Sequence, residues 1–279
     1  MPLSSRADEE NCRPEYRIDR LKENPMIRVV QIPLPKDQLR AVSKEERSLF
    51  LLLGYAANQI TMLQKLMIFS SNKTPSETVE QPISGAQTQM LVRLLVGALH
   101  EAWLLIQKRF LGVPLGREYQ DRLNHTGREA LDGLKKYFGT SNILNTLRNN
   151  YAYHHPYDED IDDAFIVAFG DDQSDDYWSL YLSESSINSF HFASDVVIVH
   201  GMMNATKATD LLAAQERITR DASLVAKLLT EFILDFSAAF VAKHFSVGNT
   251  QCEILGREQA SVKTAPSLLE FWLPFYFEL

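Results

Sequence analysis

Three long stretches of the chain carry apolar residues at the spacing of an amphipathic helix, and they constrain the fold more than any other feature. The first covers residues 43–71, where Ser43 is followed three positions later by Glu46, as in a capping box. The second covers about 85–110 and the third 210–245. Helices of this length bury their apolar faces against one another, so we predict a mainly α-helical, up-and-down bundle.

The segment at about 163–185 departs from this helical pattern. It alternates polar residues with aromatic and β-branched residues around a Gly-Asp turn, which is typical of a β-hairpin. We therefore predict a hairpin inserted into a bundle that covers 44–245. Outside it we expect a partly ordered N-terminal extension, 1–43, and a C-terminal tail, 246–279, that packs on the bundle or on a dimer partner.

Charge is distributed unevenly along the chain. The formal net charge of −8 argues against a protein whose whole surface binds nucleic acid. Basic residues gather between 108 and 155, whereas 149–206 contains no Lys or Arg and accumulates carboxylates. The chain thus has a basic middle followed by an acidic arm.

The sequence also favours a reducing compartment. The N-terminus has no apolar stretch after its charges, so we expect neither a secretory signal nor a membrane anchor. The apolar run at 90–106 is interrupted by charged residues and is too short to be expected to span a bilayer. Cys12 and Cys252 lie far apart, which does not fit a disulfide framework. We expect a cytoplasmic protein.

The main candidate for chemistry is a cluster near the end of a short helix, where Arg148 and Asn149 are followed by His154, His155 and Tyr157. A guanidinium can hold phosphate oxygens with two hydrogen bonds, and an imidazole can transfer a proton near neutral pH. On RNA, the His would deprotonate or orient a ribose 2′-hydroxyl while the Arg stabilises charge in the transition state. Such chemistry needs no metal.

Helical geometry leaves open which histidine faces the arginine. His154 follows Arg148 by six residues, about 240° around a regular helix, whereas His155 returns to the face of Arg148. Pro156 disfavours helix at His155, so either imidazole can turn toward the guanidinium. An Arg and a His at this spacing also occur by chance, as Arg93 and His100 show.

The stretch RNNYAYHHPYDEDIDDAF, which begins at Arg148, resembles the motif of the HEPN superfamily, and most closely its abortive-infection type. In that motif an Arg followed by a polar residue precedes a His, with four to six residues between them. The resemblance covers about residues 45–245. It implies a helical bundle and a metal-independent endoribonuclease with Arg148 and His154 catalytic, Asn149 supporting, and a homodimer that brings two motifs together. Some toxin members end the motif with His, one residue and Tyr, which His155 and Tyr157 match.

On this interpretation RNA is the substrate, and a defence, stress or toxin role implies an inhibitory protein partner. We expect Arg128, Lys135 and Lys136 to bind RNA if they share a cleft with the motif. The alternative is a non-catalytic HEPN-like module that binds a protein or a nucleotide, with the acidic region 158–176 as its contact surface. Many HEPN members are thought to bind rather than cleave.

Two further clusters have simpler explanations. Hard oxygen ligands near the histidines could hold a cation, but the spacing of an EF-hand is absent, so a solvated acidic turn is the preferred interpretation of His154, His155, Asp158, Asp160 and Asp162. His100 and Glu101 do not form a zinc-protease motif, and His100 is interpreted as a bundle histidine with satisfied hydrogen bonds. No phosphate loop or dinucleotide fingerprint appears, and we expect no metal and no cofactor.

Overall fold

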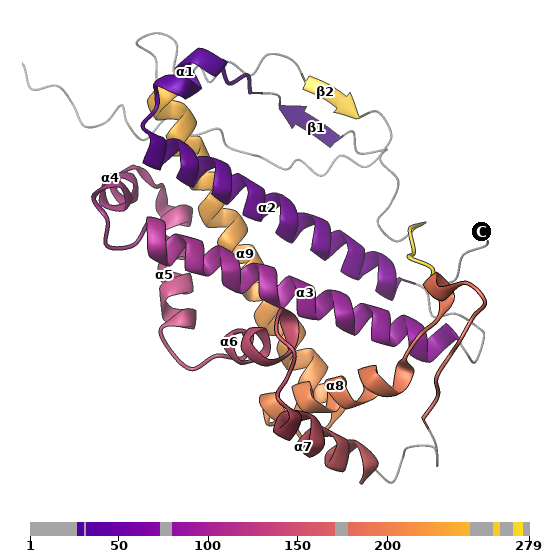
Figure 1. The fold of residues 1–279 in the computed structure, drawn as a ribbon. Helices are drawn as coiled ribbons and strands as arrows, with labels where there is room; N and C mark the ends of the chain where they lie inside the picture. The colour runs from indigo at the N-terminus through magenta and orange to yellow at the C-terminus, as the bar shows by residue number, and fades with distance from the viewer. Residues whose placement is uncertain are drawn as a thin grey trace, which may run out of the picture.

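The computed structural model describes residues 27–30, 32–72, 80–170, 178–245, 259–262 and 270–275, and these are mainly helical, as predicted. Three long helices form the centre of the bundle and run side by side (Figure 1). They are α2 (Lys44–Ser71), α3 (Glu80–Arg109) and α9 (Leu211–Phe245). These are the three helices that the apolar spacing predicts.

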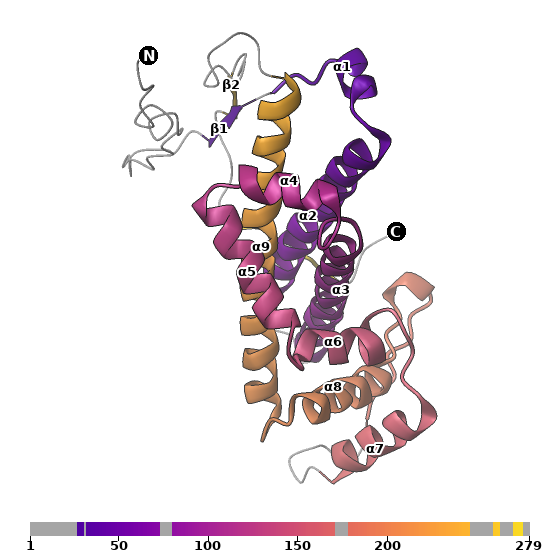
Figure 2. The ribbon, with the colours of Figure 1, turned by 90° about the vertical axis from the view of Figure 1, so that its left-hand side faces the viewer.

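The shorter helices surround this centre. Helix α4 (Pro114–Arg122) runs across α9, and α5 (His125–Phe138) packs closely against α9 (Figure 2). Helix α6 (Ile143–Leu147) leads into a π-helical turn, η1 (Arg148–Ala152), and both pack on α3. The remaining elements are α1 (Lys36–Ala41), α7 (Asp158–Phe169), the 3₁₀ turn η2 (Ser186–Asn188) and α8 (Phe192–Thr206).

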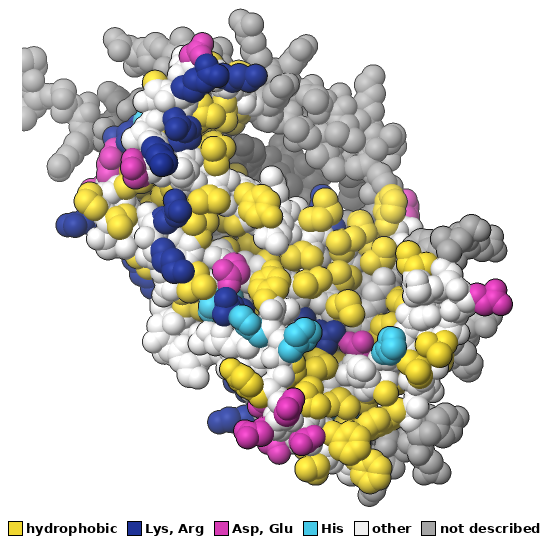
Figure 3. All heavy atoms as spheres, in the orientation of Figure 1, with side chains coloured by type: hydrophobic (Ala, Val, Ile, Leu, Met, Phe, Trp, Pro, Cys, Tyr) yellow, Lys and Arg dark blue, Asp and Glu magenta, His cyan; other side chains and the backbone are white. Residues whose placement is uncertain are grey.

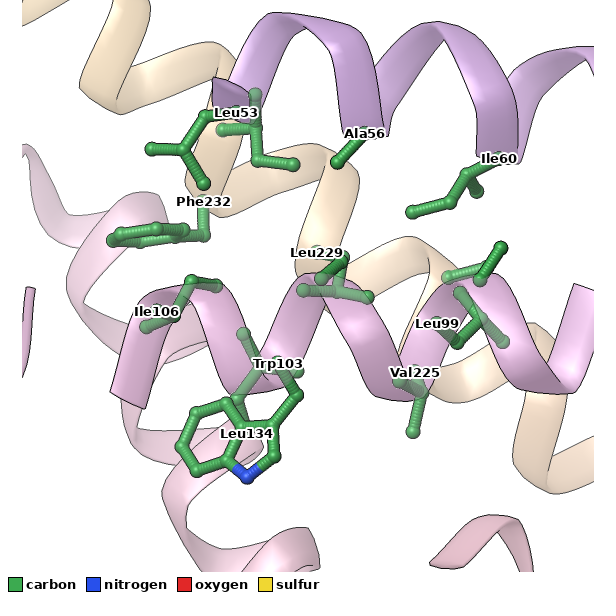
Figure 4. Packing of buried hydrophobic residues seen from close by; sticks show 14 of the residues in the cluster. Leu53, Ala56, Ile60, Leu99, Trp103, Ile106, Leu134, Val225, Leu229 and Phe232 are labelled. Carbon is green, nitrogen blue, oxygen red and sulfur yellow. The ribbon is translucent and has the colours of Figure 1, made fainter. Parts of the chain in front are cut away.

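One contiguous hydrophobic core joins the three long helices to α4, α5, α6 and α8 (Figure 4). Leu53 of α2, Leu99 of α3 and Leu229 of α9 are buried to 1% exposure or less, and residues of α5 and α6 close the core from the side. Residues of this kind recur every three or four positions along each helix, which is the spacing that places them on one face.

Two short strands pair next to the bundle. β1 (Ile27–Val30) and β2 (Gln259–Val262) are antiparallel, with Ile27 opposite Val262. β1 lies within the predicted N-terminal extension, 1–43. Nearer the C-terminus, Asn72 donates a hydrogen bond to the carbonyl oxygen of Phe271 at 2.8 Å, so part of the tail contacts the end of α2.

The predicted β-hairpin is wrong in its first half. Residues Asp158–Phe169 form helix α7, which packs on α8 through the buried side chains of Ala164 and Ala168. Apolar residues at 161, 164, 165, 168 and 169 also follow the helical period. Three carboxylates in the first turn stabilise the helix, because they lie at the positive end of its dipole. The predicted tip, 171–177, lies outside the described residues. Beyond it, Tyr181 pairs with Phe190 in an isolated antiparallel bridge.

The predicted capping box is only half formed. Ser43 Oγ accepts a hydrogen bond from the backbone N–H of Glu46 at 3.3 Å, as a helix cap should. The carboxylate of Glu46 turns inward instead, where it accepts hydrogen bonds from Tyr119, Lys243 and His244. Burial alone would raise the pKa of Glu46, but these hydrogen bonds outweigh it and lower the pKa to about 2.

Helix α3 is longer than predicted, because it begins at Glu80 rather than at about residue 85. Its segment Pro82–Arg109 is the one described helix that is long and apolar enough to cross a membrane, in contrast to our expectation for 90–106. Of its most apolar window, 61% is buried inside the bundle, where Leu95, Leu99 and Ile106 contribute to the core. Packing within this fold therefore accounts for much of its apolar character.

Candidate functional site

The predicted motif lies on the π-helical turn η1, which begins at Arg148. Helix α6 starts at the cap Asn142, whose side chain accepts a hydrogen bond from the N–H of Asn145 at 2.9 Å. The chain then widens to a π-helix through Arg148–Ala152 and leaves the helix at Tyr153. Such π-turns are rare, and they occur frequently at functional sites.

The guanidinium of Arg148 is held by two neighbours. Its Nε and Nη2 donate to Oε1 of Glu101 on α3 at 3.1 and 2.6 Å, and its Nη1 donates to Oδ1 of Asn149 at 3.0 Å. The Arg148 side chain is 23% exposed. A guanidinium has five N–H groups, so about two remain for a ligand oxygen.

A chain of hydrogen bonds links this arginine to a buried histidine. Asn149 Nδ2 donates to Oδ1 of Asn145 at 3.3 Å, and the same oxygen lies 3.0 Å from Nε2 of His100. An amide oxygen only accepts, so Nε2 of His100 must carry the proton. Burial and the nearby charge of Arg148 lower the pKa of His100, which keeps the ring neutral.

This arrangement corrects the interpretation of His100 and Glu101. His100 is 7% exposed, and its Nδ1 has no hydrogen-bond partner among the described residues. The hydrogen-bonding capacity of this ring is therefore only half used. Glu101 is the residue that neutralises and orients Arg148.

A cleft of about 480 Å³ lies next to η1. His154 and His155 line it, together with residues of α3 and α8. Figure 3 shows histidine side chains exposed across this face, with Lys and Arg side chains beside them and apolar side chains above and below. The lining residues are Met90, Arg93, Leu94, Tyr151, Ala152, Tyr153, His154, His155, Pro156, Ser194, Asp195 and Ile198.

Two tyrosines of the motif anchor η1 to its neighbours. The ring of Tyr153 covers Gly97 of α3 so closely that a Cβ there would lie 2.4 Å from the ring, and Tyr151 covers Gly201 of α8 in the same way. Burial raises the pKa of both tyrosines, and the charges of Glu101 and Arg148 also act on Tyr153. Tyr153 therefore lines the cleft and is also close enough to the Arg148 ion pair for its charges to act on the phenol.

The structure brings some of the predicted site residues together and leaves others apart. Both His154 and His155 are exposed and line the cleft, and no hydrogen bond or ion pair joins either one to Arg148 within the described chain. Tyr157 is 79% exposed at the start of α7 and does not line the cleft.

The predicted RNA-binding residues lie on α5 and do not line this cleft. Arg128 donates to the carbonyl oxygen of Asp121 at 3.0 Å, and Lys135 pairs with Asp132 at 3.0 Å. Lys136 is exposed. Arg148 does not line this cleft either, so RNA binding by these cations stays a prediction.

The described acidic residues after the motif do not line the cleft, and Asp171, Asp172, Asp175 and Asp176 lie outside the described residues. Asp158, Glu159, Asp162 and Asp163 are exposed on α7, and the cleft is not covered by them. Among the described residues, no group of three or more His, Cys, Asp or Glu side chains is close enough to hold a metal ion.

Sequence reasoning missed two residues of the cleft. Arg93, which the sequence presents only as a chance match to the motif, lies in the cleft with the two histidines. It forms an ion pair with Asp195 of α8 at 2.7 Å. A single carboxylate within the apolar run that continues as VVIV was the signal that could have identified Asp195.

No family model, curated protein or solved structure matches this chain.

Proposed function

We propose that this protein is a metal-independent endoribonuclease of HEPN type, acting in defence, stress or as a toxin. The observation that carries the proposal is the π-helical turn, which holds Arg148 and Asn149 in a hydrogen-bonded network next to a cleft lined by His154 and His155. This combination provides a fixed cation and two imidazoles that water can reach.

The reaction would be an internal transfer at one phosphodiester. The ribose 2′-oxygen attacks the adjacent phosphorus, its proton passes to an imidazole, and the 5′-oxygen leaves with a proton from an acid. His154 or His155 would serve as the proton carrier, and the free N–H groups of Arg148 would stabilise the phosphorane oxygens. The products would be a 2′,3′-cyclic phosphate and a 5′-hydroxyl.

A second copy of the chain would complete the site. Met90 (43% exposed) and Tyr153 (45%) line the cleft, and Tyr55 (68%) lies near Tyr153. Such a patch favours association, and a homodimer would bring a second motif against the first. In the homodimer, each histidine could act on phosphate held by the Arg148 of either copy.

The experiment is cleavage of labelled structured RNA in excess EDTA by wild type and by the double variant His154→Ala/His155→Ala. We expect wild type alone to cleave and to leave 2′,3′-cyclic phosphate ends, with a loss of about 100-fold or more in the variant. His191→Ala is the matched control, because His191 is an exposed histidine that does not line this cleft. Equal cleavage by the double variant would contradict the proposal.

One observation supports the alternative of a binding module. Helix α7 exposes Phe165 (44%), Ile166 (67%) and Phe169 (74%) on the same helix as its carboxylates. An apolar and acidic surface of this kind suits a basic amphipathic partner, such as an inhibitory protein. If wild type cleaves none of several RNAs, a binding function through α7 becomes the better explanation.

A further inference from the structure

The most buried charges of the cleft are those of Arg93 and Asp195. Their side chains are 11% and 12% exposed, and Nη2 of Arg93 lies 2.7 Å from Oδ1 of Asp195. The histidines of the cleft are exposed by comparison. The ion pair therefore forms a recessed polar group within the cleft.

This ion pair has unused hydrogen-bonding capacity. One hydrogen bond joins the two side chains, and neither makes another to the described part of the chain. The second oxygen of Asp195 and the remaining N–H groups of Arg93 are thus available, and both residues line the cleft. No atom of either side chain is among the buried polar atoms without a partner, so these groups are open to the cleft, where a ligand can reach them.

The other walls suit a flat aromatic ring. Met90, Leu94 and Ile198 supply apolar contacts, and Tyr151 and Tyr153 add aromatic ones. A cleft of about 480 Å³ is large enough for a nucleobase together with its ribose and phosphate. Apolar walls with a few convergent polar groups are typical of small-molecule sites.

We propose that this cleft binds guanine, with Arg93 and Asp195 reading its edge. Guanine presents O6 and N7 as adjacent acceptors, which a guanidinium binds with two hydrogen bonds. On the other side of O6, the Watson–Crick edge presents N1–H and N2–H, two donors that suit one carboxylate. Adenine, cytosine and uracil do not offer paired acceptors next to paired donors, so they cannot engage both side chains in this way.

This inference deepens the proposed function, on which its role in cleavage rests. A guanosine bound against Arg93 and Asp195 lies in the same cleft as His154 and His155. The phosphate attached to that nucleoside would then be close to the imidazoles. The base pocket would select guanosine at the cleavage position.

The test is calorimetric titration of the full chain with the 3′-monophosphates of guanosine, adenosine, cytidine and uridine. We expect guanosine 3′-monophosphate to bind at least about tenfold more tightly than the other three. In Asp195→Asn its affinity should fall by about tenfold or more, because an amide offers one acceptor oxygen in place of the two of a carboxylate. The matched control is Asp221→Asn, since Asp221 accepts a hydrogen bond from Tyr137 away from the cleft.

The outcomes separate this inference from the proposed function. Equal affinity for the four nucleotides, or no binding at all, overturns the guanine pocket even if RNA is cleaved. Selective binding of the guanosine nucleotide without any RNA cleavage supports the pocket and contradicts the ribonuclease. Selectivity is measured on wild type, so the test holds even if the Asp195 variant does not fold.

Discussion

At the scale of single residues, the chemistry of the site depends on how the guanidinium of Arg148 is oriented. Its nitrogens make three hydrogen bonds, two to Glu101 and one to Asn149. The sequence predicted Arg148 and Asn149 as neighbours in the site, but not Glu101, which is 47 positions away. Only packing of η1 on α3 brings the carboxylate within reach.

We therefore expect Arg148→Lys to lose nearly as much cleavage as Arg148→Ala. A single ammonium cannot reproduce three directed bonds and still face a phosphate, and loss of one such donor costs about 100- to 1000-fold. The free energy of unfolding should change by less than about 1 kcal/mol, because the ion pair is partly exposed. Single-turnover cleavage and denaturant unfolding measure the two effects.

Arg117→Lys is the matched control, because Arg117 is exposed on α4 and takes no part in η1 or in the hydrogen bonds of Arg148. Both its cleavage rate and its stability should match wild type. If the Arg148→Lys protein cleaves at the wild-type rate, cleavage does not need the several directed hydrogen bonds of the guanidinium, and the prediction is wrong.

At the scale of elements, the contact between η1 and α3 depends on the absence of a side chain at Gly97. The Tyr153 ring occupies the place where a Cβ would lie, at 2.4 Å from its nearest atom. By contrast, Gly85 on the same helix has nothing within 4 Å of its Cβ position. The two glycines look alike in the sequence, and their different roles follow only from what packs against them.

Gly97→Ala should displace Tyr153 and with it the wall of the cleft. We expect it to lower the free energy of unfolding by about 1–3 kcal/mol, as overpacking does, and to reduce RNA cleavage. Gly85→Ala should instead stabilise the protein by about 0.5–1 kcal/mol, because alanine is the better helix former. Urea unfolding of the two variants checks the difference in sign, and stabilisation by both would rule out the tight contact at Gly97.

At the scale of the whole molecule, the buried cluster around Glu46 joins three distant parts of the chain. Glu46 of α2 accepts hydrogen bonds from Lys243 and His244 at the end of α9, and from Tyr119 of α4. Lys243 also reaches Glu118 at 2.8 Å. This polar cluster connects the first and last long helices of the bundle.

We therefore expect the free energy of unfolding to decrease in acid, because Glu46 becomes protonated. Its pKa is about 2 in the folded protein against an ordinary value of 4.5, so its contribution is complete above about pH 4.5 and is lost as the pH falls toward 2. We expect Glu46→Gln to cost about 3 kcal/mol at pH 7 and progressively less below pH 4.5. Unfolding free energies of both proteins across this range measure the effect.

Glu129→Gln is the control for this prediction, because Glu129 pairs with His125 at the surface, where both side chains are more than two-thirds exposed. Glu129→Gln should lower the free energy of unfolding by less than about 1 kcal/mol at every pH. A difference between wild type and Glu46→Gln that stays constant from about pH 7 to about pH 2 would contradict the assigned pKa.

The sequence by itself determined the three long helices, because apolar residues every three or four positions specify a buried face whatever packs against it. It also determined that Arg148, Asn149 and the two histidines lie close along the chain. Only the tertiary structure decided that 158–169 is helical, because its apolar residues fit both periods and packing on α8 selects one. The partners Glu101, His100, Arg93 and Asp195 were likewise decided by the packing of α3 against η1 and α8, since contacts between distant residues leave no periodic signal in a single sequence.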